Sequence, residues 1–396
     1  MASGREVVVV SGVRTAIGDY GGALKDLAPT ELAAQVIKEA VKRAKLDSRE
    51  IGACVLGNVI HTEAKDMYFS RVAALKGGLA EESSALTVNR LCGSGLQAIV
   101  SASQMILLGD ADAAVGGGAE SMSRGGYLMP TLRWGQRMSD GSVVDMMVGA
   151  LTDPFDTVHM GITAENIAEK WKISREQQDE FSVESHRRAV NAIEKGYFKD
   201  QILPIEMKTR KGTTVFDRDE HPRSDASVEG MAKLRAAFKK DGSVTAGNAS
   251  GINDGAAAVV LMERAAADKK GLKPMARLVS YGIAGVDPRI MGIGPVPASK
   301  KALDKAGLKV EQMDVIESNE AFAVQALAVS CDLKLDSKKT NPNGGAVGLG
   351  HPIGATGALL TVKALYELQR TGGKYALVTM CIGGGQGIAA VFERLQ

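Results

Sequence analysis

One cysteine of this chain lies where the surrounding pattern favours a reactive thiol. Cys92 follows an expected strand and opens an expected helix, with Gly93 and Gly95 beside it. The free N–H groups and the dipole at a helix start lower the pKa of a thiol and favour the thiolate. We therefore expect Cys92 to be a nucleophile. The alternative, a small buried apolar residue, suits Cys54 and Cys331 better, because they lie in an apolar strand and an apolar helix.

A histidine at a second expected helix start supplies a matching base. His351 lies in the segment Gly-Leu-Gly-His-Pro-Ile-Gly-Ala-Thr-Gly. Pro352 disfavours the α conformation at the residue before it and suits the first turn of a helix, so a helix is predicted to begin at Pro352. If the chain has two similar halves, this helix is the counterpart of the helix after Cys92. The two helix starts are then expected to bring Cys92 and His351 together.

A second cysteine, Cys381, precedes the glycine-rich segment Ile-Gly-Gly-Gly-Gln-Gly. That segment lacks the G-x-G-x-x-G pattern, and a strand rather than a helix is expected after it, which disfavours a phosphate-binding loop. Its glycines favour the close approach of backbone N–H groups to a reacting oxygen. A zinc site formed by Cys92, His351 and Cys381 is disfavoured because no C-x-x-C spacing is present.

Four sequence blocks together resemble the signature blocks of the thiolase family, in order and from end to end of the chain. They are Cys92-Gly93-Ser94-Gly95, Asn319-Glu320-Ala321-Phe322, Gly350-His351-Pro352-Ile353-Gly354 and Cys381-Ile382-Gly383-Gly384-Gly385-Gln386-Gly387. Gly93 after the nucleophile resembles the acetyl-CoA acetyltransferase branch and the broad-range bacterial β-ketothiolases. The resemblance implies an acetyl-CoA C-acyltransferase, which runs a reversible Claisen condensation or the thiolysis of a 3-ketoacyl-CoA.

The resemblance also implies roles for the site residues. Cys92 would carry the acyl group, with His351 as its base, and Cys381 would take the α-proton of acetyl-CoA. One oxyanion hole would be formed by the N–H groups of Cys92 and Gly383, and the other by His351 and a water held by Asn319. Neither a cofactor nor a metal is expected, since coenzyme A thioesters are the substrates.

Residues for binding coenzyme A are likewise implied by the resemblance. The pantetheine channel would be lined by His159, Met160, Ala246, Ser250 and Phe322. Arg223 would meet the nucleotide phosphates, in a stretch from 208 to 240 with nine Lys and Arg against five Asp and Glu. The alternative for this stretch is a solvated surface, and Phe322 could equally be a core residue.

Two other functions fit parts of the pattern. A related condensing enzyme, such as a ketoacyl or hydroxymethylglutaryl synthase, carries one active-site cysteine, whereas Cys381 is a second one. A non-catalytic acyl-CoA carrier would need a channel but no reactive thiol, and the presence of all four blocks argues against it.

The elements that position these residues alternate between strands and helices. In the first half we expect strands at 6–10, 53–60, 85–88 and 111–115 and helices at 30–45 and 95–108. In the second half we expect strands at 276–281, 314–317, 375–380 and 388–392 and helices at 298–306, 321–333 and 354–369. Residues 37–58 align without gaps on residues 299–320, which favours an internal duplication.

The expected fold class is α/β, with thiolase-like duplicated halves layered α/β/α/β/α and an inserted loop domain. Residues 1–120 plus about 250–270 would form the N-terminal half, and 271–396 the C-terminal half. The inserted loop domain, 121–249, would provide coenzyme A binding and subunit contacts.

Composition limits the partners and the location. The 396 residues carry a net charge of +2, which is too balanced to indicate nucleic acid or an anionic membrane. No apolar run is expected to reach the roughly 18 residues of a membrane span. Four widely spaced cysteines do not form a disulfide framework, so a cytoplasmic location is expected. The resemblance suggests a homotetramer, a dimer of dimers, with part of the Met-rich loop 121–148 at the subunit contact.

Overall fold

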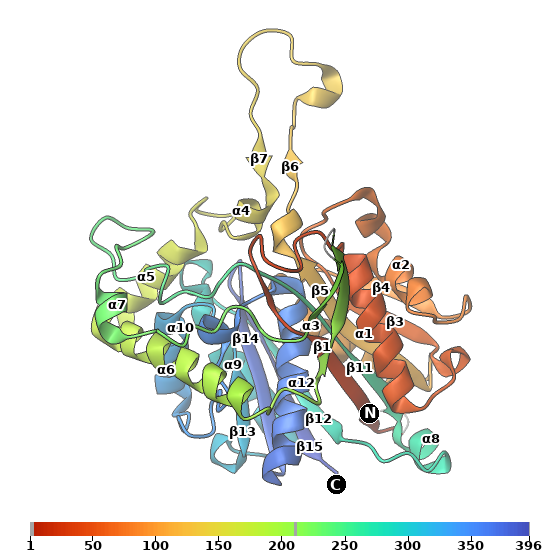
Figure 1. Ribbon diagram of the computed structural model, residues 1–396. Helices are drawn as coiled ribbons and strands as arrows, with labels where there is room; N and C mark the ends of the chain where they lie inside the picture. Colours follow the sequence, from red (N-terminus) through yellow and green to blue (C-terminus); the bar gives the residue numbers. More distant parts are fainter. Residues whose placement is uncertain (1–3, 210–211, 396) are drawn as a thin grey trace.

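A single large mixed sheet forms the centre of the computed structural model, which describes residues 4–209 and 212–395 (Figure 1). Its strand order is β13-β14-β15-β12-β1-β11-β5-β3-β4. The first-half strands are β1 (Val7–Thr15), β3 (Ala53–Gly57), β4 (Ser84–Val88), β5 (Ala113–Ser121) and β11 (Asn253–Glu263). The second-half strands are β12 (Ala276–Gly285), β13 (Val315–Ser318), β14 (Tyr375–Ile382) and β15 (Gln386–Arg394).

The two halves of the sheet repeat the same order and the same directions. In the first half β1 pairs with β11 and β11 with β5, both antiparallel, and β5 pairs with β3 in parallel. In the second half β12, β15, β14 and β13 repeat this pattern pair by pair. β1 and β12 join the halves through the register Val8↔Arg277 and Val9↔Ala276. β4 is an additional strand at the edge of the first half.

The internal alignment read from the sequence falls on equivalent elements. Helices α1 (Pro29–Ala44) and α9 (Pro295–Ala306) end at aligned residues, and β3 and β13 begin at aligned residues. Lys45 and Gly307, also aligned, both end their helices in the left-handed conformation, with φ of 55° and 66°. The expected duplication is therefore confirmed.

Five layers result from the way the helices pack. α1 and α2 (Phe69–Lys76) cover the outer face of the first half, and α9 with α10 (Ala323–Leu333) covers that of the second. α3 (Ser94–Leu108) and α12 (Ile353–Thr371) pack against each other and contact strands of both halves. Their close approach requires glycine, because a Cβ on Gly357 would lie 2.2 Å from the backbone N of Leu96. The expected α/β/α/β/α arrangement is confirmed.

The expectation that no apolar segment reaches membrane-span length is wrong for Leu91–Leu108, which contains α3. This window has a mean hydropathy of 1.5, and within the described residues it is the one helical segment that passes the length and composition test. Its position gives the reason. α3 packs against β3, β5 and α12, so several of its faces contact apolar neighbours.

Several predicted boundaries move in the structure. β5 extends to Ser121, beyond the predicted end at 115, because its glycine run lies inside the sheet: a Cβ on Gly118 would lie 2.2 Å from the carbonyl oxygen of Gly354. α12 begins at Ile353 with Pro352 as its N-cap, between the two starts predicted from the sequence, 352 and 354.

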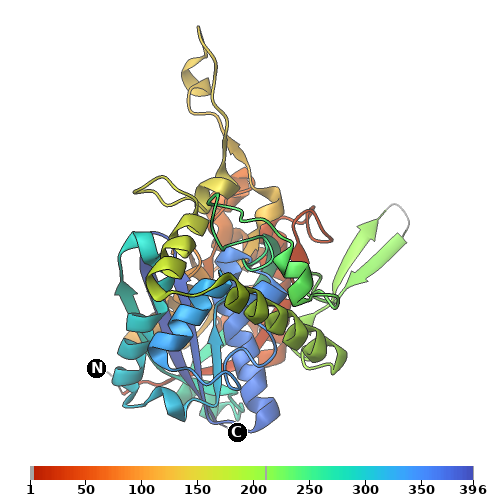
Figure 2. The same cartoon turned by 90° about the vertical axis from the view of Figure 1, so that its left-hand side faces the viewer.

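The middle of the chain, 121–249, lies over one end of the sheet and carries two projections (Figures 1 and 2). One is an arm of residues 125–145, and the other is the antiparallel pair β9–β10. The elements here are β6 (Tyr127–Leu128), β7 (Val144–Asp145), α4 (Met146–Ala150), α5 (Met160–Trp171), α6 (Arg175–Glu194), β8 (Ile202–Leu203), β9 (Ile205–Thr209), β10 (Gly212–Phe216) and α7 (Val228–Ala232). The other short strand and α-helices are β2 (Gly18–Asp19), α8 (Arg264–Lys269) and α11 (Ala346–Leu349).

Candidate active site

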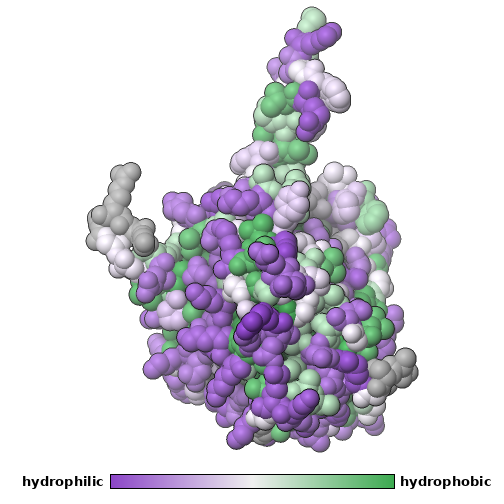
Figure 3. Space-filling view, turned by 90° about the vertical axis from the view of Figure 1, so that its right-hand side faces the viewer, coloured by the Kyte–Doolittle hydropathy of each residue, from purple (hydrophilic) through white to green (hydrophobic). Residues whose placement is uncertain are grey.

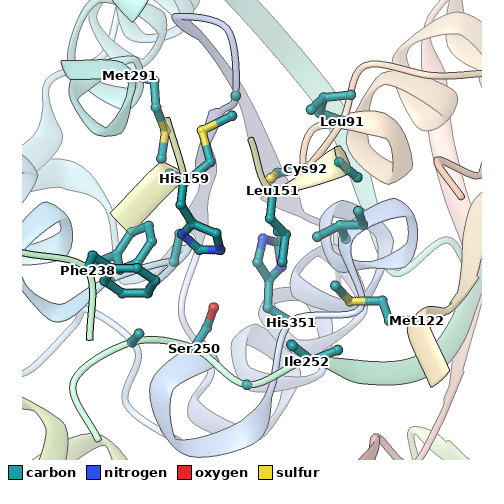
Figure 4. A pocket seen from close by; sticks show the side chains of 18 of the residues that line it. Leu91, Cys92, Met122, Leu151, His159, Phe238, Ser250, Ile252, Met291 and His351 are labelled. Atoms are coloured by element: carbon teal, nitrogen blue, oxygen red, sulfur yellow. The ribbon is translucent and has the colours of Figure 1, made fainter. Parts of the chain in front are cut away.

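An apolar pocket of about 380 Å³ lies where the two halves and the middle segment meet. Eight of the eleven residues expected at the site line it: Cys92, His159, Met160, Ala246, Ser250, Phe322, His351 and Gly383. Figure 4 shows His159 and His351 on opposite sides of the pocket, with Ser250 between them. Cys381, Asn319 and Arg223 are not among the lining residues. The pocket therefore brings together the expected nucleophile, its base and most of the expected coenzyme A contacts.

A tight turn places Cys92 at the pocket. Leu91 adopts a left-handed conformation with φ of 45°, which is uncommon for a residue with a branched side chain. The Asn89 side chain accepts from the backbone N of Leu91 at 3.0 Å. The Ser94 hydroxyl accepts from the backbone N of Arg90 at 2.8 Å and donates to the carbonyl oxygen of Leu91 at 2.7 Å. Neighbouring residues thus hold the strained turn that presents the thiol.

The expected lowering of the Cys92 pKa is wrong in direction. Burial raises the pKa of this thiol to about 11, and hydrogen bonds from the backbone N–H groups of Gly383 and of Cys92 itself offset only part of that rise. The α3 helix begins at Ser94, two residues beyond the cysteine, so its free N–H groups do not outweigh the loss of solvent. In the unliganded chain Cys92 is a neutral thiol, and a base must take its proton.

The hydrogen bonds around His351 assign its tautomer. Its Nδ1 lies 2.6 Å from the Thr356 hydroxyl, which already donates its proton to the carbonyl oxygen of Pro352 at 2.9 Å. Nδ1 must therefore carry a proton and donate it, which leaves Nε2 unprotonated. Burial lowers the pKa of His351 to about 4. The imidazole is consequently a neutral base, and the lone pair on Nε2 accepts only a long hydrogen bond, 3.4 Å, from the side-chain N of Asn319.

Asn319, directly after β13, lies beside Nε2 of the imidazole. Its side-chain N donates to Nε2 of His351 at 3.4 Å. Its side-chain oxygen is buried and has no hydrogen-bond partner among the residues that the structure describes. A buried acceptor without a partner is costly, so this oxygen is suited to receive a hydrogen bond from a water or from a bound substrate.

Cys381 is the penultimate residue of β14 and is fully buried next to the nucleophile. Burial raises its pKa, and the nearby Cys92 raises it further. The turn after β14 needs glycine: Gly384 and Gly385 have φ of 78° and 84°. A Cβ on Gly383 would come within 2.7 Å of the Met160 side chain. The glycine-rich segment therefore lets the backbone N–H of Gly383 approach the Cys92 thiol.

Aromatic side chains form the wall opposite His351. The rings of His159 and Phe238 stack with centroids 4.5 Å apart, and Phe322 meets Phe238 edge to face. The Nδ1 of His159 accepts from the backbone N of Gly161 at 3.0 Å, so its proton lies on Nε2. Burial lowers the pKa of His159. This ring is a neutral N–H donor on a largely apolar wall.

Arg223 lies outside the pocket and is exposed. Its backbone N donates to His186. The hydrogen bond from His221 lowers the pKa of Asp19 most, burial opposes this, and the charge of Arg223 lowers that pKa further. The preceding segment is fixed to β1 by a buried ion pair of Arg14 with Asp219, with N–O distances of 2.7 and 3.0 Å. The structure thus gives Arg223 a fixed place but does not bring it to the thiol.

Sequence reasoning assigned no role to some residues that complete the site. Thr356 fixes the tautomer of His351, and its one signal was its place in the first turn of the helix after His351. Phe238, Leu151 and Met291 line the pocket without any sequence signal, since they come from loops distant in the chain. Within residues 4–209 and 212–395, no group of three or more His, Cys, Asp and Glu is arranged to hold a metal ion.

A neutral thiol, a neutral imidazole and backbone N–H donors around one apolar pocket can transfer an acyl group through a covalent thioester. Comparisons with known proteins agree with this chemistry. Two family models match, "Thiolase, N-terminal domain" over residues 7–265 and "Thiolase, C-terminal domain" over residues 272–394. The domain boundaries expected from the sequence, including that of the inserted loop domain, stay a prediction.

Similar proteins cover the whole chain. The beta-ketothiolase BktB of Cupriavidus necator is 67% identical over 99% of this chain and 100% of its own length. A Bacillus anthracis acetyl-CoA acetyltransferase structure matches at a TM-score of 0.97 and 48% identity, covering 99% of both chains. Human mitochondrial 3-ketoacyl-CoA thiolase in complex with CoA matches at 0.96 and 45%, covering 99% of this chain and 98% of that one. The chain therefore belongs to the thiolase family.

Proposed function

We propose that this acyltransferase of the thiolase family works as a broad-range β-ketothiolase, with Cys92 as the acyl carrier, His351 as its base and Cys381 as the base of the condensation step. One observation carries the proposal. The unprotonated Nε2 of His351 and the protonated thiol of Cys92 lie in the same pocket, beside backbone N–H donors. This arrangement suits nucleophilic attack on a thioester, because the base is ready to take the thiol proton as the sulfur attacks.

The first half-reaction loads the enzyme. His351 takes the proton of Cys92 while the sulfur forms a bond to the carbonyl carbon of an acyl-CoA. The N–H groups of Cys92 and Gly383 stabilise the negative oxygen of the tetrahedral intermediate. The bond to the sulfur of coenzyme A then breaks, and His351 returns the proton to that sulfur. The acyl group stays on Cys92 and coenzyme A leaves as a thiol.

The second half-reaction forms the carbon–carbon bond. His351, neutral again, takes the thiol proton of Cys381, and the resulting thiolate removes an α-proton from acetyl-CoA. The carbanion then attacks the acyl group on Cys92. The raised pKa of Cys381 makes its thiolate a strong base, which the weakly acidic α-carbon requires. With the proton from Cys381 on its Nε2, His351 can donate to the enolate oxygen, together with a water on the free oxygen of Asn319. The sulfur of Cys92 leaves as a thiolate and takes the proton from His351, while Cys381 keeps the α-proton. Both thiols and the neutral imidazole are thereby regenerated, and thiolysis runs the same steps backwards.

Substrate binding follows the walls of the pocket. Pantetheine lies along His159, Met160, Ala246, Ser250 and Phe322, and Arg223 meets the nucleotide phosphates at the outer end. Cys92 packs together with Met122, Leu151 and Ile252 in a small apolar cluster, so an acyl chain on its sulfur contacts apolar side chains. This supports the use of acyl groups longer than acetyl. Thiolysis rates with 3-ketoacyl-CoA substrates of increasing length test it; activity confined to the four-carbon substrate would contradict it.

The arm supports a homotetramer, arranged as a dimer of dimers. Trp134 and Met138 are 86% and 87% exposed there, together with other apolar side chains, Tyr127, Leu128, Leu132 and Val143. Figure 3 shows the arm standing clear of the body. Such exposure is unfavourable for a single chain and favours a subunit contact. Replacing residues 129–143 by a short turn should lower the native mass measured by light scattering; an unchanged mass would contradict this contact.

A cytoplasmic location accompanies this function. Three thiols must stay reduced for this reaction: those of Cys92, Cys381 and coenzyme A. A reducing compartment keeps them in that state. Fractionation of the native host with detection of the enzyme tests the location, and recovery outside the cytoplasm would contradict it.

The covalent step is tested directly by mass spectrometry. Incubation with acetyl-CoA should add one acetyl group, on the peptide that contains Cys92. Cys381→Ser should still form this acetyl-enzyme but lose exchange of the acetyl α-hydrogens with deuterated water by about 10² to 10⁴. Cys331, on α10, is exposed and not buried as the sequence suggested, so it gives the matched control, and Cys331→Ser should keep both reactions. Acetylation on Cys54 or Cys331 alone would refute the assignment of the nucleophile.

A further inference from the structure

The start of α12, just after the proposed base, has no side chain of its own that accepts hydrogen bonds from its free backbone N–H groups. A helix start leaves backbone N–H groups without partners inside the helix, and a nearby Ser, Thr, Asp or Asn side chain often accepts from one of them. The segment from Gly350 to Gly354 contains none of these residues, and Pro352 at the N-cap gives no side-chain hydrogen bond. The N–H groups of this buried turn must therefore find acceptors elsewhere in the chain.

Two side chains of the other half supply those acceptors. The side-chain oxygen of Asn253, the first residue of β11, accepts from the backbone N of His351 at 2.9 Å. The carboxylate of Glu120, near the end of β5, accepts from the backbone N of Gly354 at 2.8 Å. Both side chains are fully buried. The turn that carries His351 is thus held at both ends by residues far away in the sequence.

Glycines make room for both contacts. Gly350 has φ of 106°, and a Cβ there would lie 2.5 Å from the side chain of Asn253. A Cβ on Gly354 would lie 2.5 Å from a carboxylate oxygen of Glu120. The two glycines on either side of His351 therefore let the backbone approach the two acceptors.

The two acceptors are themselves fixed. The side-chain N of Asn253 donates to the carbonyl oxygen of Gly18 at 3.1 Å and to Asp19 at 3.2 Å. Glu120 also accepts from the side-chain N of Asn58 and from the backbone N–H groups of Val59 and Ile60, each at 3.1 Å. Each acceptor thus has several bonds within the first half, and its position does not depend on the turn it holds.

We propose that Asn253 and Glu120 are positioning residues for the thiolase reaction: they fix the backbone of the 351–354 turn so that Nε2 of His351 meets the thiol of Cys92. The inference rests on the proposed role of His351 as base. A base displaced by about 1 Å loses on the order of a hundredfold in rate, so hydrogen bonds to its backbone have a direct effect on catalysis.

A double-mutant cycle separates positioning from stability. The rate of Cys92 alkylation by iodoacetamide is measured in Asn253→Ala, in His351→Ala and in the double variant. Asn253→Ala should slow alkylation by about 10- to 100-fold, with KM for coenzyme A within about twofold. In the His351→Ala background the same change should have no further effect, because Asn253 acts only through the base. Equal slowing in both backgrounds, or a wild-type rate in the folded single variant, would overturn the inference.

Two further variants keep the test decisive if Asn253→Ala does not fold. Asn253→Asp keeps an oxygen for the His351 N–H but loses the donor to Gly18 and faces the carboxylate of Asp19, so it should be less stable yet alkylate within about threefold of wild type. Glu120→Gln replaces an acceptor by an NH₂ group that faces backbone N–H donors, and it should slow alkylation only when His351 is present. Slowing by Glu120→Gln without His351 would contradict positioning, as would an Asn253→Asp variant slowed a hundredfold.

Ser280→Ala is the matched control. It removes a buried hydrogen bond of 2.6 Å to the carbonyl oxygen of Ala302, far from the pocket, and should lower Tm without slowing alkylation.

Failure of the proposed function itself would show in another variant. If His351→Ala alkylates Cys92 at the wild-type rate, His351 is not the base.

Discussion

The two helix starts that meet at the pocket hold equivalent places in the duplicated halves but are held by different means. At the start of α3, Ser94 and Asn89 make hydrogen bonds within the turn that presents Cys92. At the start of α12, the backbone N of His351 is bonded to Asn253, a residue of the other half. The nucleophile therefore sits on a turn that its own neighbours determine. The base sits on a turn that exists only when both halves are folded together.

The largest expected effect is at the α3 start. Cys92→Ala should abolish formation of the acetyl-enzyme and reduce thiolysis by at least about a thousandfold, since the covalent intermediate cannot form. Steady-state thiolysis and mass spectrometry check it. Because the turn is determined locally, the variant should keep the Tm of wild type within a few degrees. Substantial acetylation of this variant would show that the covalent intermediate forms on a residue other than Cys92.

A smaller loss is expected at the α12 start. His351→Ala should slow acylation by about 10² to 10⁴, the usual scale for loss of a general base. The pH profile of Cys92 alkylation separates the two groups. Wild type should be nearly flat between about pH 6 and 9, because His351 is already neutral above its pKa of about 4. In His351→Ala the rate should rise tenfold per pH unit towards the thiol pKa of about 11. A flat profile in the variant would mean that another group takes the proton.

A pair of variants, one in each turn, compares the two turns directly. Thr356→Val removes the acceptor for Nδ1 of His351 and lets the other tautomer form, with its proton on Nε2, so alkylation should fall by about tenfold. Ser94→Ala should cost only about threefold, because the backbone N–H groups of Gly93 and Ser94 still donate to Arg90 and Leu91. Alkylation rates at matched Tm check both. The reverse order would show that the α3 turn is the more fragile one.

The smallest effect is expected outside both helix starts. Arg223→Glu should raise KM for coenzyme A several-fold with little change in kcat, the pattern of lost uniform binding. The effect should shrink in high salt, since the charge is exposed. A substrate truncated to the pantetheine part should be insensitive to the change. Equal loss with the full and the truncated substrate would place Arg223 in a different role.

The sequence by itself determined the chemistry and the local architecture. Cys92, His351 and Cys381 lie in short glycine-rich segments. The residue types in each segment are set by contacts between sequence neighbours, so a window of ten residues is enough to recognise them. The alternation of strands and helices and the alignment of 37–58 on 299–320 were equally local. The alternation and the duplication were predicted correctly because turns, helix starts and periodic burial depend mainly on nearby residues.

Only the tertiary structure decided the protonation states and the walls of the site. The sequence predicted a low pKa for Cys92 from its helix start, but burial by residues of both halves raises it to about 11. Phe238 and Leu151 reach the pocket from distant loops, and Asn253 and Glu120 hold His351 across the interface of the halves. Desolvation and long-range hydrogen bonds depend on which distant segments pack together. A local sequence pattern does not contain this information.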